Sequence, residues 1–166
     1  MVGIVTCAVL LAIAPASMAG DRMSTRAWSA WQAASAALLP YEQRAEGELS
    51  RCEPQAAGAR ALVEWARCAS PAWRPWRSEA RGFASLLRQL AGRMPPGECR
   101  RQLATYSGQA GAHLDAFSKT LGRALVADVE GFRLAAAELA ASEIATPRQK
   151  ARARSACRPD RTAASA

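Results

Sequence analysis

The sequence predicts an all-α protein: an up-and-down helical bundle of four to five helices stapled by two disulfides. Three observations predict it. The chain is rich in alanine, leucine, arginine, glutamate and glutamine, which all favour helices. Apolar residues recur at the three-and-four spacing of one helical face, whereas the alternating β-branched and aromatic segments typical of strands are missing. Four cysteines follow the N-terminal apolar segment, an even number that predicts two staples.

The size and composition of the chain indicate one thin core. With 166 residues, half of them hydrophobic by type, the chain has room for a single compact domain. Much of this apolar share is alanine, and aromatic residues make up only 6% of the chain, so a few large side chains must anchor the core. The anchors that we expect are Trp28, Trp31, Trp65, Phe117 and Phe132.

The N-terminal segment has the pattern of an export signal. Residues 2–19 form an uncharged apolar run, with Ser17 and Ala19 at the third and last positions before a cut. A transmembrane helix needs about 20 apolar residues, and Pro15 interrupts the end of this shorter run. The n-region lacks lysine and arginine, which leaves an uncleaved anchor or a misplaced start as the alternatives. We expect a signal peptide over residues 1–19, cleaved near Ala19, and a periplasmic or secreted mature protein.

The first two helices are expected on either side of a short turn. The first helix runs from about Ser24 to Arg51, and Pro40 should kink or briefly break it, since proline removes a backbone donor. The second helix runs from Pro54, a favourable residue for a first turn, to about Ala69. The apolar stripe of the first helix comprises Trp28, Trp31, Leu38, Tyr41, Ala45, Leu49 and Cys52.

A loop and a third helix follow. Two prolines make the segment SPAWRPWR, residues 70–77, a predicted loop. The third helix then runs from about Ser78 to Arg93 and returns the chain to the end that holds Cys52. A turn over residues 94–97 ends it, because two prolines and a glycine fall together there.

The rest of the chain is expected to be helical with one or two interruptions. From Glu98 the helical period continues through roughly 40 residues without proline, as one very long helix or as two joined near Gly122 or Gly131. Thr146 and Pro147 predict the start of a last short helix with a frayed tail. The predicted units are a signal peptide, a helical bundle domain and a basic C-terminal helix with its tail: residues 1–19, 20–145 and 146–166.

An even number of cysteines in an exported chain predicts two disulfides among Cys52, Cys68, Cys99 and Cys157. Long spacings without a C-x-x-C pair disfavour a metal site. If the second helix starts at Pro54, Cys68 lies about 14 residues, or roughly 21 Å, from the turn that holds Cys52. A disulfide needs Cα atoms about 4.4 to 6.8 Å apart. This separation makes Cys52–Cys68 the least favourable pairing, and the third helix should bring Cys99 back near Cys52. We therefore expect Cys52 to pair with Cys99 and, by elimination, Cys68 with Cys157.

Positive charge is concentrated in two stretches of the chain. The formal net charge is +8, and residues 71–101 and 147–161 are its most basic parts. Such surfaces attract anionic lipid, polyanionic glycan or an acidic protein face. Tryptophans in the loop at 70–77 either plug the open end of the bundle or form a contact surface. The candidate contact surface comprises Trp73, Arg74, Trp76, Arg77, Arg148, Arg152 and Arg154.

The sequence carries no catalytic or cofactor motif that we can assign. G-x-S-x-G, H-E-x-x-H, C-x-x-C-H and a phosphate-binding glycine loop are missing. His113 and Asp115 stand at i and i+2 on a helix, on different faces, so they make no dyad. Glu42 with Glu46, or Glu46 with Asp128, could form the carboxylate pair of a glycan hydrolase, but helical bundles expose many such pairs. We expect no catalytic residue, no metal and no cofactor.

These observations predict an exported, non-enzymatic helical interaction protein, such as an inhibitor, an immunity factor, an adaptor or a small chaperone. Its partner is expected to be a protein with an acidic face. The alternative is a cationic protein that binds an anionic membrane or envelope polymers. An enzyme acting on cell-wall glycan is the third hypothesis. Nucleic acid is not an expected partner, because the predicted export separates the protein from it.

Overall fold

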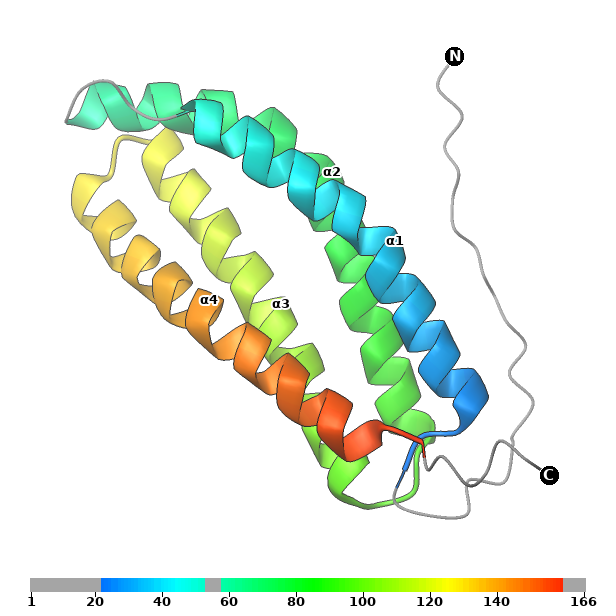
Figure 1. Cartoon of the computed structure of the whole chain (residues 1–166). Coiled ribbons are helices and arrows are strands. Elements are labelled where there is room, and N and C mark those ends of the chain that lie inside the picture. The colour runs from blue at the N-terminus through cyan, green and yellow to red at the C-terminus, as the bar shows by residue number, and fades with distance from the viewer. Residues whose placement is uncertain (1–21, 53–57, 160–166) are drawn as a thin grey trace.

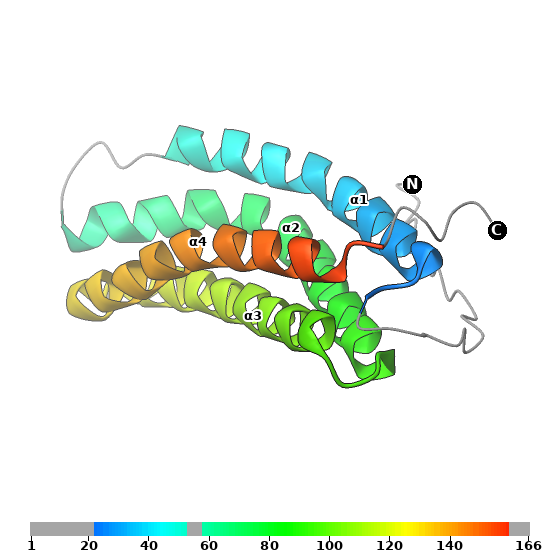
Figure 2. The ribbon, with the colours of Figure 1, turned by 60° about the horizontal axis from the view of Figure 1, so that its bottom comes forward.

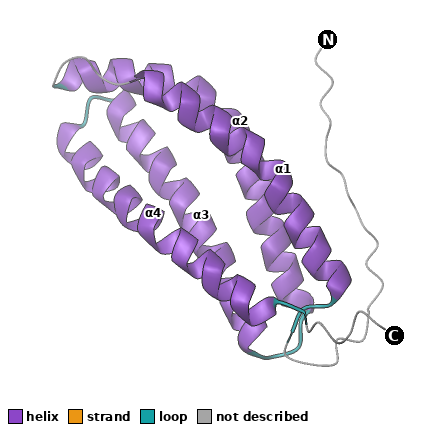
Figure 3. Cartoon of the chain, viewed as in Figure 1, coloured by secondary structure: helices purple, strands orange, loops and turns teal. Residues whose placement is uncertain are grey.

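A computed structural model describes residues 22–52 and 58–159, which form α-helices and contain no strand (Figures 1 and 3). The predicted all-α bundle with two disulfides is therefore confirmed. The predicted signal peptide lies outside the described residues. The helices are α1 (Thr25–Leu49), α2 (Ala59–Arg93), α3 (Glu98–Leu125) and α4 (Val129–Cys157), with a 3-10 turn (Ser50–Cys52) after α1.

The four helices pack in chain order, α1 on α2, α2 on α3, and α3 on α4. Over the described residues α1 and α4 hardly touch along their lengths. They meet at one end of the molecule, where the Met23 backbone N–H donates to the Cys157 carbonyl oxygen at 3.2 Å. Figure 1 shows the result as two pairs of neighbouring helices, α1 with α2 and α3 with α4.

Helix α1 matches its predicted extent closely but shows no break at Pro40. Its start is capped by Ser24, whose side-chain oxygen accepts a hydrogen bond from the Ala27 backbone N–H at 3.2 Å. Pro40 is exposed, and so is Ala36, whose carbonyl loses its helical partner to the proline. Because this carbonyl lies on the solvent side, the lost hydrogen bond does not end the helix.

The segment at 70–77 is helical, so the predicted loop is wrong. Pro71 and Pro75 are exposed, and α2 bends in their region, as Figure 2 shows. Proline costs about 3 kcal/mol or more inside a helix, because it removes a donor and crowds the preceding turn. A continuous buried face offsets this cost: Ala66, Ala69, Trp73, Ala80, Phe83, Ala84, Leu87 and Leu90.

The long helical region that was predicted from Glu98 onward consists of two helices, and the break falls between Gly122 and Gly131. Ala127 has a left-handed φ of 58° there. Asp128 caps α4 by accepting the Gly131 N–H at 2.9 Å. A Cβ at position 131 would collide with the Asp128 carboxyl group, so glycine allows this cap to close.

Both predicted disulfide pairings are wrong. Cys52 pairs with Cys68 at a Cα–Cα distance of 5.6 Å, and Cys99 pairs with Cys157 at 4.6 Å. The prediction failed because it started the second helix directly after Cys52. Instead α2 begins at Ala59, and its first turns extend past the end of α1 (Figure 2). The helix then passes Cys52 on its way back, which brings Cys68 beside it.

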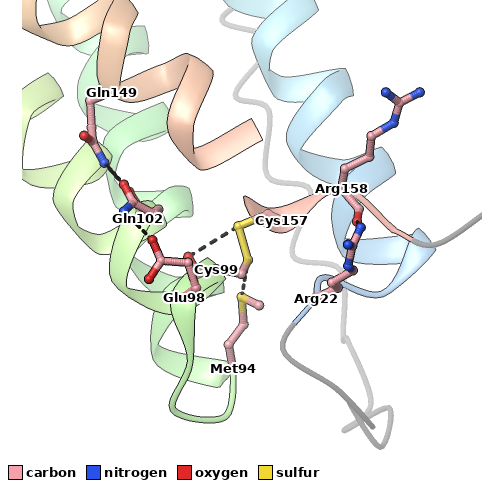
Figure 4. The surroundings of a disulfide bond; sticks show 8 residues. All are labelled: Arg22, Met94, Glu98, Cys99, Gln102, Gln149, Cys157 and Arg158. Atoms are coloured by element: carbon pink, nitrogen blue, oxygen red, sulfur yellow. Dashed lines mark hydrogen bonds between the residues drawn. A yellow bond between two sulfur atoms is a disulfide. The ribbon is translucent and has the colours of Figure 1, made fainter. Parts of the chain in front are cut away.

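The Cys99–Cys157 disulfide lies at the end of the bundle where α3 begins and α4 ends (Figure 4). Both cysteines are fully buried, and the Cys157 sulfur lies 3.3 Å from the Cys99 carbonyl oxygen. Nearby, the buried Gln149 amide donates to the Gln102 side-chain oxygen at 2.6 Å. These contacts hold the part of α4 that follows Pro147 against α3. Pro147 therefore lies inside α4, and the predicted separate last helix is wrong.

The expected anchors all belong to the core or pack against it. Trp31 is only 2% exposed, and the other four are partly buried against the central cluster. Trp31 also lies 6.2 Å from Tyr106, measured between ring centroids. Three buried aromatic side chains were not among the predicted anchors, namely Trp73, Phe83 and Tyr106. The core therefore draws its aromatic residues from α1, α2 and α3 together.

Candidate functional site: a groove between α1 and α4

A groove of about 460 Å³ opens where α1 and α4 do not pack against each other. Its walls are formed by α1 and α4, and its floor by α2 and α3. Ligand pockets commonly enclose about 300 to 1,000 Å³ and are mostly apolar with a few polar groups. The groove has this size and character, and it is the candidate site.

The floor of the groove is aromatic. The rings of Trp73 and Phe117 stack with centroids 3.9 Å apart, and Trp76 lies 4.6 Å from Trp73. The His113 ring meets Trp76 edge to face at 6.0 Å. Trp73 and Trp76 lie in the same stretch of α2 as Pro71 and Pro75, so the segment that suggested a loop instead contributes to the floor. The other large floor residues are Phe83, Tyr106 and Leu114.

The floor also contains unpaired polar groups. The indole N–H groups of Trp73 and Trp76 are buried and have no hydrogen-bond acceptor among the described residues. An unsatisfied buried donor costs about 1–3 kcal/mol, and such donors are rare in folded proteins. Two such donors on one floor lower the stability of the fold, and proteins accept a cost of this kind mainly at functional sites.

The walls carry the charge of the groove. Glu42 and Glu46 come from α1, and Glu143 and Lys150 come from α4. Three carboxylates against one ammonium group make a net formal charge of −2 when His113 is neutral, in a chain whose total is +8. The groove is thus a locally acidic site on a basic protein. The remaining wall residues are Leu38, Ala45, Leu49, Thr146 and Pro147.

Burial perturbs two acids inside the groove. It raises the pKa of Glu42, with Lys150 lowering this pKa and Glu46 raising it further. Burial also raises the pKa of Tyr106 far above its usual range, so the phenol stays protonated. Glu42 therefore carries its charge in an environment that solvates it poorly. A cation that entered the groove would relieve this cost.

His113 is neutral and serves as a hydrogen-bond donor. Burial lowers its pKa, although Glu143 opposes this shift. Its Nδ1 lies 2.8 Å from the Ser142 hydroxyl oxygen, and that hydroxyl donates to the Leu139 carbonyl oxygen at 2.7 Å. The tautomer that fits both contacts carries its proton on Nδ1 and leaves Nε2 as the acceptor.

The structure separates the predicted contact residues into two groups. Trp73 and Trp76 line the groove, with Trp73 only 3% exposed. None of the predicted arginines lines it. Arg77 is half-buried, and the exposed members of the set are Arg74, Arg148, Arg152 and Arg154.

Sequence reasoning noted Glu42 and Glu46 only as a carboxylate pair. It missed Tyr106, Glu143 and Lys150 as site residues. The sequence of α1 held one signal for the site. Glu42 and Glu46 share a three-and-four stripe with apolar residues, whereas a stripe that faces solvent would be polar throughout. Asp128 does not line the groove and pairs instead with Arg123 at 2.9 Å.

Replacing Glu42 tests this electrostatic description. The raised pKa means that the folded protein holds the proton of Glu42 more tightly than the unfolded chain does. This contribution to stability is complete below the ordinary carboxyl pKa and is lost as the pH rises through the raised pKa. At neutral pH the half-buried charge therefore lowers stability. We expect Glu42→Gln to raise the melting temperature at pH 7, by a margin that shrinks as the pH falls to 4.

The control is Glu48→Gln, which removes an exposed carboxylate from the same helix. It should change the melting temperature little at either pH. A lower melting temperature for Glu42→Gln at pH 7 would show that the Glu42 charge is stabilised in the groove, contrary to this description.

No described helix is both long enough and apolar enough to span a membrane. Within residues 22–52 and 58–159, no group of three histidine, cysteine or carboxylate side chains is placed to hold a metal ion.

The chain matches no protein-family model, no curated protein and no solved structure. Its class is therefore defined by its own fold and site. Over residues 22–52 and 58–159 it is a disulfide-stapled bundle of four α-helices with an open, aromatic-floored groove. The two disulfides indicate that it matures in an oxidising environment.

Proposed function

We propose that the chain is an exported, non-enzymatic interaction protein that binds a partner protein in the groove between α1 and α4. The observation that carries this proposal is the aromatic floor of the groove, which α1 and α4 do not close over and in which Trp76, His113 and Phe117 stay partly exposed. In a closed up-and-down bundle the first and last helices are neighbours and cover such a floor. Large aromatic side chains in a central, accessible depression are the residues that dominate binding energy at protein interfaces.

The cross-links support a role in binding. Cys52–Cys68 ties the wall helix α1 to the floor helix α2, and Cys99–Cys157 ties the wall helix α4 to the floor helix α3. Each wall is thus fixed to the floor beside it. A preorganised groove loses less conformational entropy when it binds, which favours affinity. The same cross-links, with the apolar segment at residues 2–19, support export to the periplasm or the medium.

A groove-blocking substitution tests the proposal. Ala110 lines the groove from α3 and is half-buried, so Ala110→Trp should fill the space above the floor. We expect the mature, oxidised protein to retain a stoichiometric partner from its own envelope extract at high salt, and Ala110→Trp to lose it. Mass spectrometry of the retained material is the measurement.

Two more variants make this result specific. Ala104→Trp adds the same ring to an exposed position of α3 outside the groove and should retain the partner. Thr146→Trp blocks the groove from α4 and should lose it, which guards against a folding defect in one variant. Equal retention by all four proteins would contradict the groove as the site.

A second candidate function is binding to anionic envelope polymers. The exposed arginines of α4 favour it: Arg148, Arg152 and Arg154. Their attraction would fall steeply as ionic strength rises, whereas an interface with an aromatic core would persist. Salt-sensitive recovery of lipid or mixed polyanions, unaffected by the groove variants, would support this second candidate over the first.

A further inference from the structure

The walls of the groove present two helical stripes, one on α1 and one on α4, that do not pack against each other. On α1 the stripe runs from Leu38 to Leu49 at spacings of three and four residues. On α4 it runs from Glu143 to Lys150 with the same spacings. Such stripes are the positions of a helix that pack against an adjacent helix. The α1 stripe spans about 16 Å at 1.5 Å per residue, the length of about three helical turns.

The charge of the groove restricts what can occupy it. The side chains of Glu42, Glu46 and Glu143 surround an apolar floor. Among the described residues Lys150 is the cation that lines the groove, and Arg154 acts on the floor residue Tyr106 from outside the lining. A negatively charged occupant would add to this repulsion. A cationic one would gain ion pairs with the carboxylates, together with cation–π attraction from the indole of Trp76.

We infer that the occupant of the groove is a basic amphipathic helix of the partner protein, with apolar side chains on the aromatic floor and lysine or arginine against Glu42, Glu46 and Glu143. This inference rests on the proposed function and names the chemistry of the partner. Helix-in-groove recognition uses anchors at the same three-and-four spacing that the walls display.

The net charge of the protein and the charge of the groove predict opposite preferences for a peptide. A chain of net charge +8 attracts acidic peptides through its long-range field and repels basic ones. The groove, with its net formal charge of −2, requires the opposite preference. A measured preference for a basic helix can therefore come from the local site and not from the overall charge.

Two synthetic peptides test the preference. Both have about 15 residues and one leucine face, and their polar faces carry either lysine or glutamate. Binding to the full mature, oxidised protein is followed by fluorescence anisotropy of labelled peptide at about 0.15 M salt, where long-range fields are screened beyond about 8 Å. We expect the lysine-faced peptide to bind at least about tenfold more tightly. Equal affinity, or preference for the glutamate-faced peptide, overturns the inference.

Substitution of the carboxylates tests their role directly. We expect Glu42→Gln/Glu143→Gln to weaken binding of the lysine-faced peptide about tenfold. The control Glu48→Gln/Glu79→Gln removes the same charge from exposed positions outside the groove and should leave binding within about twofold. Equal weakening by both double variants overturns the inference, because the effect would then come from the overall charge.

The blocking variants separate the two proposals. If Ala110→Trp abolishes binding of the glutamate-faced peptide, and the lysine-faced peptide does not bind, the groove is the site and the inferred chemistry is wrong. If Ala110→Trp and Thr146→Trp leave the tighter peptide unaffected, the groove is not the site and the proposed function fails with the inference. If both variants release the lysine-faced peptide while Ala104→Trp retains it, both stand.

Discussion

Replacing Trp73 with alanine is expected to lower the free energy of unfolding by about 3–5 kcal/mol, the cost of deleting a buried tryptophan. The ring is 3% exposed and stacks on Phe117 from the neighbouring helix. Its loss would leave a cavity at the contact between α2 and α3. Urea denaturation of the oxidised protein, followed by circular dichroism, measures the change.

The neighbouring residue provides the control. Arg74 is exposed, so Arg74→Ala should change the free energy of unfolding by no more than about 0.5 kcal/mol. Trp73→Phe keeps an aromatic ring and removes the unpaired indole N–H, so it should cost much less than Trp73→Ala. A small effect of Trp73→Ala would contradict the buried position and favour the exposed contact loop that the sequence suggested.

The second large effect is expected from the disulfides. Cys99→Ala/Cys157→Ala opens a loop with a sequence separation of 58, and should cost about 4 kcal/mol in the chain-entropy treatment of cross-links. Cys52→Ala/Cys68→Ala opens a loop of 16 and should cost about 3 kcal/mol. The burial of Cys99 and Cys157 adds a packing loss on removal, so the first variant should be the less stable.

Urea denaturation of both double variants under oxidising conditions gives the comparison. Peptide mapping of the unreduced protein provides an independent check on the pairing. A peptide that joins Cys52 to Cys99 would restore the pairing predicted from sequence and contradict the present fold. Greater stability of the Cys99→Ala/Cys157→Ala variant would show that its long loop is restrained without the bond.

Helix positions were predictable where local signals and burial agree. Ser24 caps α1, and the apolar stripe that begins at Trp28 continues through it, so its predicted and observed bounds differ by only one or two residues. At residues 70–77 the local sequence predicted a loop, but the segment is helical. Pro71 and Pro75 suggested a loop, but both lie on the exposed side of a helix whose other side is buried. Propensity is a weak prior when packing opposes it.

The disulfide pairing was less accessible to sequence reasoning. It depends on where α2 begins relative to the end of α1, and a displacement of a few residues moves Cys68 along the helix by several ångströms. Element boundaries are the least reliable part of a prediction from one sequence. The ranking of pairings therefore failed, although the number of bridges was right.

The candidate site was predictable only in fragments. The sequence indicated Trp73 and Trp76 as contact candidates and Glu42 with Glu46 as a carboxylate pair. Their meeting with Glu143 depends on how the first and last helices diverge, which is a property of the tertiary packing. The periodicity of a single helix does not reveal the angle between two helices that do not pack against each other along their lengths.

The arrangement of the cross-links has a further consequence. The two covalent loops, one closed by Cys52–Cys68 and the other by Cys99–Cys157, do not interlock in sequence. The disulfides define two modules, α1 with α2 and α3 with α4, which are joined by one connection of the main chain. Neither disulfide spans the groove. Each wall is rigid on its own module, whereas the spacing between the walls depends on the non-covalent packing of α2 on α3. The spacing of the walls is therefore set by that packing, together with the Met23–Cys157 backbone hydrogen bond at one end, and by neither disulfide.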